Sequence, residues 1–147
     1  MNEETERDAG YQYTLVVGPD GPDRAWTEGT LMRGGLEVAA ATPEDLAGMP
    51  DIVPPRLAVL DDSSDRAERM AIFRRLRGHA AMAGVPVVVL AYDADIESFS
   101  EAIGRGAAAY LVKPVSAEEL VEVAHKLSGW LRSSDRTEKR RRLRRPL

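Results

Sequence analysis

The sequence has no cysteine among its 147 residues. This absence excludes disulfide bonds, zinc sites built from thiolates and thiol nucleophiles. Only two histidines, His79 and His125, are present, which leaves little for a histidine-based metal site. No apolar run approaches the roughly 20 residues that a membrane-spanning helix needs. The first eight residues are acidic and polar, unlike a secretory signal, so we expect a cytoplasmic protein.

The charge of the chain is divided unevenly along its length. Residues 135–147 carry seven Lys or Arg against two acids, a net charge of +5, whereas the remainder has 13 basic and 22 acidic residues, a net charge of −9. Such an uneven distribution of charge indicates which partners a protein can attract, and it does not indicate the fold. We expect a disordered N-terminus over residues 1–10, one domain over residues 11–132 and a basic tail over residues 133–147.

Short runs rich in β-branched and apolar residues alternate with helical patterns five times along the chain. The expected strands cover residues 13–17, 36–40, 57–60, 85–90 and 110–112. The expected helices cover residues 23–33, 66–77 and 95–105, and two further helices are capped by Thr42 and Ser116. The run 85–90 is apolar throughout, which is typical of a strand in the middle of a sheet covered on both faces. This order predicts an α/β fold with a doubly wound parallel sheet.

Charged and small residues follow the expected strands at the points where the strands end. In chain order these are Asp20, Asp61, Asp62, Ala91, Lys113 and Pro114. In a doubly wound sheet the ligand site lies outside the carboxyl ends of the strands, so we expect these residues to line one pocket. The sequence has no G-x-G-x-x-G and no Walker A run, so nucleotide binding has no support.

Two stretches of the second half are distinctive. Residues 85–90 read Val-Pro-Val-Val-Val-Leu, and residues 106–120 read Gly-Ala-Ala-Ala-Tyr-Leu-Val-Lys-Pro-Val-Ser-Ala-Glu-Glu-Leu. With them, the chain resembles the receiver domain of bacterial two-component response regulators, the CheY-like family. The resemblance implies a flavodoxin-like (βα)5 sheet with strand order 2-1-3-4-5. It also implies that Asp61 is the phosphoacceptor position, Lys113 the lysine of the family and Tyr110 its aromatic switch residue.

The chain departs from the pattern of the family at the positions that carry the chemistry. Gly18 and Pro19 stand where the family has two acids that hold Mg²⁺, and Ala91 stands where it has Thr or Ser. Eight residues after the acceptor position the family usually has Gly, whereas this chain has Arg69. Because phosphoryl transfer to a carboxylate depends on positioning and on neutralisation of charge, these losses predict weak or absent phosphorylation.

We therefore expect a single-domain atypical receiver, a pseudo-receiver, that signals through protein–protein contacts without a phosphoryl switch. It is expected to be no enzyme, beyond weak autophosphorylation and autodephosphorylation at Asp61 at most, and to need no cofactor. One alternative is a functional receiver that is phosphorylated on Asp61, with Mg²⁺ held weakly by Asp20 and Asp61. A second alternative is a nucleic-acid-associated protein that binds through its basic tail.

Several residues also have simpler interpretations. Asp61 can cap the turn after its strand, and Lys113 can pair with Asp61 as a structural bridge. By resemblance to the family, a partner would contact the face formed by the helix over residues 95–105, the strand over residues 110–112 and the exposed side of the last helix, with Phe99, Ile103 and Tyr110 as candidate contacts. A homodimer is a further option. The tail is either a solvated extension, a contact for an acidic partner or nucleic acid, or a continuation of the last helix. No membrane contact is expected.

Overall fold

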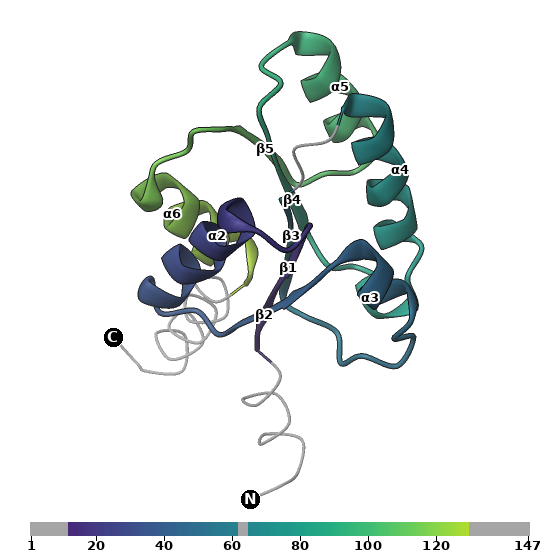
Figure 1. Cartoon of the computed structure of the whole chain (residues 1–147), viewed down its shortest axis with the longest axis vertical. Coiled ribbons are helices and arrows are strands. Elements are labelled where there is room, and N and C mark those ends of the chain that lie inside the picture. The colour runs from purple at the N-terminus through teal and green to yellow at the C-terminus, as the bar shows by residue number, and fades with distance from the viewer. Residues whose placement is uncertain (1–11, 62–64, 130–147) are drawn as a thin grey trace, which may run out of the picture.

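The computed structural model describes residues 12–61 and 65–129, which form one five-stranded parallel sheet. The strands lie in the order β2-β1-β3-β4-β5, so the expected flavodoxin-like topology is confirmed (Figure 1). Their bounds are β1 Thr14–Val17, β2 Val38–Ala41, β3 Leu57–Asp61, β4 Val87–Ala91 and β5 Ala109–Val112.

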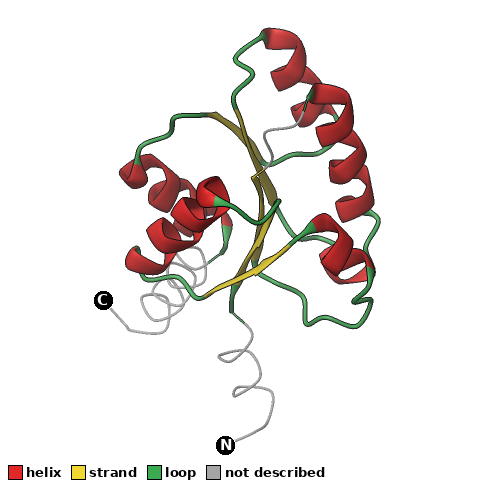
Figure 2. Ribbon diagram, in the orientation of Figure 1, coloured by secondary structure: helices red, strands yellow, loops and turns green. Residues whose placement is uncertain are grey.

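Helices cover both faces of this sheet (Figure 2). One face carries α2 and α6, and the other carries α3, α4 and α5 (Figure 1). The helical segments are α2 Pro22–Arg33, α3 Pro43–Ala47, α4 Arg66–Arg77, the 3₁₀ helix η1 Ala80–Met82, α5 Ile96–Gly104 and α6 Ala117–Leu127. No helix in the described part of the chain is both long enough and apolar enough to span a membrane.

The caps that the sequence predicts fix where several helices begin. Thr42 accepts a hydrogen bond from the Asp45 amide and Ser116 accepts one from the Glu119 amide, so both start a helix as expected. Asp65 and Asp95 cap α4 and α5 in the same way. A capping side chain satisfies an amide that the helix itself leaves without a partner, which stabilises each start by about 1 kcal/mol.

The core lies on both faces of the central strands. All residues of β1, β3 and β4 are buried, as expected for strands covered on both sides. Leu15, Val17 and Leu60 belong to the core under α3, α4 and α5, whereas Val16 and Val59 belong to the core under α2 and α6. The alternation follows from the two-residue period of a strand.

The second strand differs from the expected range of residues 36–40. It begins only at Val38, because the Leu36 amide is hydrogen-bonded to the Leu31 carbonyl and still belongs to the turn that closes α2. Gly35, with a φ of 93°, supplies the left-handed conformation that this turn requires. Helix α3 has only five residues, and η1 was not predicted.

Candidate functional site

Asp61, which the resemblance implied as the acceptor position, is the last residue of β3, and its side chain is fully enclosed. Its Oδ2 accepts a hydrogen bond of 2.5 Å from the Thr27 hydroxyl, which projects from the buried face of α2. Its Oδ1 pairs with the Lys113 ammonium, which follows β5. The chain therefore supplies a partner for each carboxylate oxygen, and the expected convergence of Asp61 and Lys113 is what the structure shows.

Lys113 is the centre of a small charged network at this edge of the sheet. Its Nζ also lies 3.1 Å from Asp23 Oδ2 and 5.0 Å from the centre of the Tyr92 ring. Burial by itself would lower the pKa of Lys113, but the hydrogen bonds and charges of Asp61 and Asp23 outweigh it and raise that pKa. The hydrogen bond and charge of Lys113 in turn lower the pKa of Asp23.

Gly18 follows β1 and lies directly beside Asp61, the last residue of β3. A Cβ atom at position 18 would lie 2.1 Å from the backbone oxygen of Asp61. Any side chain there requires the two strand ends to move apart, so this backbone excludes an acid at the first of the two positions after β1. Pro19, the next residue, offers no side-chain oxygen.

Ala91 ends β4 and is fully buried, and its carbonyl accepts a 2.8 Å hydrogen bond from the Lys113 amide. Pro114 follows a cis peptide bond from Lys113. Outside them lies a shallow cleft with a volume of about 150 Å³, lined by Asp23, Trp26, Tyr92, Lys113, Pro114 and Val115. Lys113 and Pro114 line this cleft, whereas Asp61 and Ala91 lie beneath it.

The structure places Asp20 apart from the rest of the expected pocket. The Asp20 side chain is 89% exposed and pairs with Arg24 at 3.2 Å, while Arg24 also donates to the Gly18 carbonyl. Asp62 lies outside the described residues. The second acid that contacts Lys113, beside Asp61, is Asp23 in the first turn of α2.

Sequence reasoning missed both residues that α2 contributes to the site. Asp23 and Thr27 are four residues apart, so a helix that starts at Pro22 presents them on one face. Thr27 is completely buried, and a hydroxyl at an inward helix position needs a buried partner. The four-residue spacing of Asp23 and Thr27, in a helix that begins just after the first strand, was the signal that could have identified these two residues.

Tyr110 is buried, with its hydroxyl donating a 2.7 Å hydrogen bond to the Asp93 carbonyl. Its ring meets Phe99 edge-on at 6.1 Å. Burial raises the pKa of Tyr110, and the nearby carboxylates of Asp93 and Asp95 add to this, against the opposing charge of Arg69. Of the three expected partner-contact residues, only Phe99 and Ile103 are therefore exposed.

Arg69 occupies the position at which the receiver family usually has glycine. Its side chain is 1% exposed and pairs at 2.8 Å with Asp93, in the loop after β4. The same Asp93 holds Tyr110 through its carbonyl oxygen, so Arg69 and Tyr110 fasten one loop from two sides. Because a buried arginine needs a partner of opposite charge, this pair fixes the loop beside Ala91.

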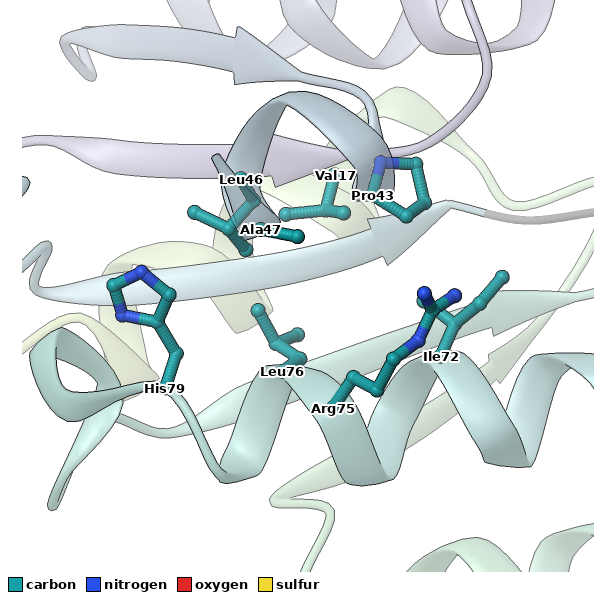
Figure 3. Close-up of a pocket in the computed structure, with 8 residues that line it drawn as sticks. All are labelled: Val17, Pro43, Leu46, Ala47, Ile72, Arg75, Leu76 and His79. Atoms are coloured by element: carbon teal, nitrogen blue, oxygen red, sulfur yellow. The ribbon is translucent and has the colours of Figure 1, made fainter. Parts of the chain in front are cut away.

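A second cavity lies away from this site, between α3 and α4 (Figure 3). Its volume is only about 40 Å³ and its lining is mostly apolar, with Leu46, Ile72 and Leu76 among the residues drawn. Arg75 and His79 stand at its rim (Figure 3). A space of this size admits a water molecule rather than a metabolite.

The residues at the site do not fit a magnesium ion. Magnesium needs several oxygen ligands in near-ideal octahedral geometry. Among the described residues, no group of three or more Asp, Glu or His side chains is arranged to hold a metal. Both oxygens of Asp61 already have partners in Thr27 and Lys113, and Gly18 and Pro19 add no carboxylate.

No family model and no curated protein matches the sequence. Solved structures do match it. The receiver domain of NtrX from Brucella abortus is 29% identical, with a TM-score of 0.65 over 78% of this chain and 97% of that one. A CheY-like response regulator receiver domain protein from Methanospirillum hungatei is 22% identical, with a TM-score of 0.66 over 83% and 98%.

A third similar structure is the receiver domain of a sensor histidine kinase from Pseudomonas aeruginosa, with a magnesium ion coordinated in its active-site cleft. It is 18% identical, with a TM-score of 0.64 over 80% of this chain and 98% of that one. The similarity to these proteins supports a receiver domain in two-component signalling. Receiver domains are in general signalling modules rather than enzymes.

Proposed function

We propose that this receiver domain signals by protein–protein contact and does not use a phosphoryl switch. The observation that carries the proposal is the internal pairing of Asp61, whose two carboxylate oxygens are bound by Thr27 and Lys113 in an enclosed space. A phosphoryl group added to Asp61 would have to displace the Thr27 hydroxyl or the Lys113 ammonium. It would then bring negative charge beside Asp23 without a metal to neutralise it.

The surroundings of the acceptor position support the same proposal. Ala91 has no hydroxyl that could bind a phosphoryl oxygen, and the Gly18 backbone leaves no room for an acid. Tyr110 already lies inside the structure, held by the loop that Arg69 fastens. The parts that would report phosphorylation to the surface are therefore fixed by contacts that exist without it.

The surface that fits a protein partner is formed by α5, β5 and the loop after β4. Exposed apolar side chains gather there: Tyr92, Ile96, Phe99, Ile103 and Val112. Ile96 is 74% exposed although it opens a helix whose other face is packed on the core. Exposed apolar residues grouped on one face are typical of an interaction site, and aromatic residues are enriched in such sites.

The phosphoryl part of the proposal is tested with a small-molecule phosphodonor. The protein is incubated with acetyl phosphate and Mg²⁺ and its intact mass is measured, with an active CheY-like receiver treated in parallel. We expect the mass of this protein to stay unchanged while the control gains a phosphoryl group. A gain of one phosphoryl group, lost in an Asp61→Asn variant, would instead establish the phosphoacceptor alternative.

The partner surface is tested by comparing variants that each add one arginine. Ile96→Arg and Ile103→Arg alter the α5 face, and Met32→Arg alters an apolar residue at the end of α2 whose exposed fraction, 52%, lies between their 74% and 38%. A protein retained by immobilised wild type and by Met32→Arg should be lost with both α5 variants, with or without the phosphodonor. Equal retention by all three variants would contradict this surface.

A further inference from the structure

An apolar groove runs along β2, the strand at one end of the sheet. Its volume is about 470 Å³, and its lining comes from β1, β2, α3 and the segment after α3: Tyr13, Leu15, Glu37, Val38, Ala39, Ala40, Ala41, Leu46, Met49, Ile52 and Val53. Because α3 has only five residues, it does not extend over the start of β2, and Ala39 and Ala40 are exposed.

The walls of this groove are held in place by hydrogen bonds. The Tyr13 hydroxyl donates to the Val53 carbonyl, and a ring nitrogen of His79 lies 2.9 Å from the Met49 carbonyl. The segment that follows α3 forms one wall of the groove, and these two contacts hold it at Met49 and at Val53. The groove is therefore formed before anything binds in it, which lowers the entropic cost of binding.

The edge of β2 beside the groove is open to a further strand. Its backbone pairs with β1 on one side, and within the described residues no strand lies on the other side. Natural edge strands are usually protected by charged residues, proline or a bulge, but Val38–Ala41 has only small apolar side chains. An extended segment can add to such an edge through backbone hydrogen bonds, with alternate side chains entering the groove.

The charge of the surface around the groove indicates which extended segment binds there. Between Leu36 and Pro55 the chain has four exposed acids and no lysine or arginine. The acids are Glu37, Glu44, Asp45 and Asp51. A basic segment is complementary to this surface, and residues 135–147 of the same chain carry a net charge of +5.

The place where the described chain ends points to the same segment. Ser128, just after α6, lines a small hollow together with Tyr13, Leu36 and Arg56. Leu36 lies two residues before β2, and Tyr13 is also part of the groove wall. Leu143 lies fourteen positions after Gly129, and such a length can span on the order of 46 Å when extended. The described chain therefore ends near the groove wall, and the residues that follow are numerous enough to reach the groove.

The pattern of the tail suits an edge strand. Leu143, Arg145 and Leu147 are alternate residues and share one face of an extended segment. If their backbone groups face β2, Pro146 lies between them with its missing N–H turned away, a position that proline tolerates. A second copy of β2 would fit less well, because Ala39 and Ala41 are too small to fill the groove.

We propose that the basic segment 140–147 of this chain docks intramolecularly along the edge of β2. Leu143 and Leu147 occupy the apolar groove, and the arginines lie against the acids around it. The segment thereby covers an edge that would otherwise be available to other strands.

The absence of cysteine permits a direct test on the full chain. A nitroxide is attached to an Arg142→Cys variant, whose single thiol lies next to Leu143 but on the opposite face. We expect it to broaden the amide NMR signals of Ala39, Ala40 and Met49. The broadening should weaken near 1 M salt, where charges are screened beyond about 3 Å. Broadening elsewhere, or nowhere, would overturn the proposal.

A mixed sample distinguishes the tail of the same molecule from that of another. Isotope-labelled chain without nitroxide is mixed with unlabelled chain that carries it, and we expect no broadening at β2. Broadening in the mixture equal to that in the first sample would assign the groove to the tail of a second copy and contradict intramolecular docking.

Substitutions then test the two contacts separately. Replacing Leu143 and Leu147 by Ser should make exchange of the Val38 and Ala40 amides, which face the open edge of β2, roughly tenfold faster. Glu37→Lys should weaken the nitroxide effect at β2, whereas Glu122→Lys, the same charge change on the exposed side of α6, should leave it intact. Equal effects of the two lysine variants would show that net charge, rather than the groove, controls the contact.

Discussion

At the residue scale, the side chain of Asp61 is held by contacts within the fold. Its carboxylate is enclosed, and it is kept in that state by one hydroxyl and one ammonium group from two other elements. A buried charge is tolerated only when its partners are in place. The stability of the fold is therefore tied to Thr27 and Lys113.

The first prediction concerns the Thr27 hydroxyl. Thr27→Val keeps the shape of the side chain but leaves Asp61 Oδ2 without a donor. We expect the free energy of unfolding, measured by urea denaturation, to fall by about 1–3 kcal/mol. Thr30→Val is the control, since Thr30 is buried on the same helix but does not contact Asp61. An equal loss in the two variants would show that the bond to Asp61 contributes nothing.

The second prediction concerns Lys113. Lys113→Met removes the cation from an enclosed carboxylate, so we expect a loss of about 3–5 kcal/mol in the free energy of unfolding at neutral pH. The pKa of Lys113 is raised in the fold. Its stabilisation is thus complete below the ordinary lysine value of about 10.4 and is lost as the pH rises through the folded-state value.

The pH profile separates this charge effect from a loss of packing. Burial also raises the pKa of Tyr13 and Tyr110, so wild type and the Lys113→Met variant both lose stability at alkaline pH. The difference between wild type and Lys113→Met should nevertheless shrink above about pH 10, because the unfolded wild-type chain then releases the lysine proton that the folded state still holds. A difference that is constant across that range would refute the charge effect.

The sequence predicted part of this site and missed another part for a physical reason. Asp61, Ala91 and Lys113 each end or follow a strand, and the ends of parallel strands meet at one edge. Asp23 and Thr27 come from a helix, where contact with the site depends on the helical phase rather than on strand ends. Asp20 was also expected in the pocket because it follows the first strand, but its carboxylate is exposed and pairs with Arg24.

At the element scale, the ends of β1 and β3 approach so closely that only glycine fits at position 18. The third prediction is that Gly18→Ala lowers the free energy of unfolding by about 1–3 kcal/mol, because the added methyl group overlaps the Asp61 carbonyl. Gly21→Ala is the matched control, since a Cβ there has nothing within 4 Å. A neutral Gly18→Ala would mean that the strand ends can separate at no cost.

Elements with strong local signals were predicted well. Helix α4 has its expected bounds of residues 66–77, fixed by Asp65 at its start and Gly78 at its end. The start of β2 was misplaced, because Leu36 has the composition of a strand residue but its amide closes the turn after α2. This hydrogen bond, from the Leu36 amide to the Leu31 carbonyl, belongs to the end of α2. The residue types around Leu36 do not reveal it.

At the scale of the whole molecule, the two halves of the core share the same strands. Residues of β1, β3 and β4 alternate between the two faces, so neither face can lose its packing while the other keeps its strands. The fourth prediction is therefore a single cooperative unfolding transition. Circular dichroism in the far ultraviolet and tryptophan fluorescence should give the same urea midpoint, and separate midpoints would contradict it.

The alternation of strands and helices predicted a doubly wound parallel sheet, because parallel strands need helical crossovers of one hand. The strand order 2-1-3-4-5 came from the resemblance to the receiver family and is the order that the structure has. The sequence pattern did not predict the groove beside β2. That groove exists because α3 stops after five residues, at Gly48, and leaves the edge strand without a cover.

The central claim is that Asp61 serves the fold and not a phosphoryl switch. The most direct test is an amide NMR titration of the full protein with Mg²⁺ and then with Mg²⁺ plus beryllofluoride, a mimic of the phosphoryl group. We expect the signals of Asp61, Ala91 and Tyr110 to stay in place at millimolar concentrations of both. Saturable shifts that move these three signals together would show a working acceptor site and contradict the claim.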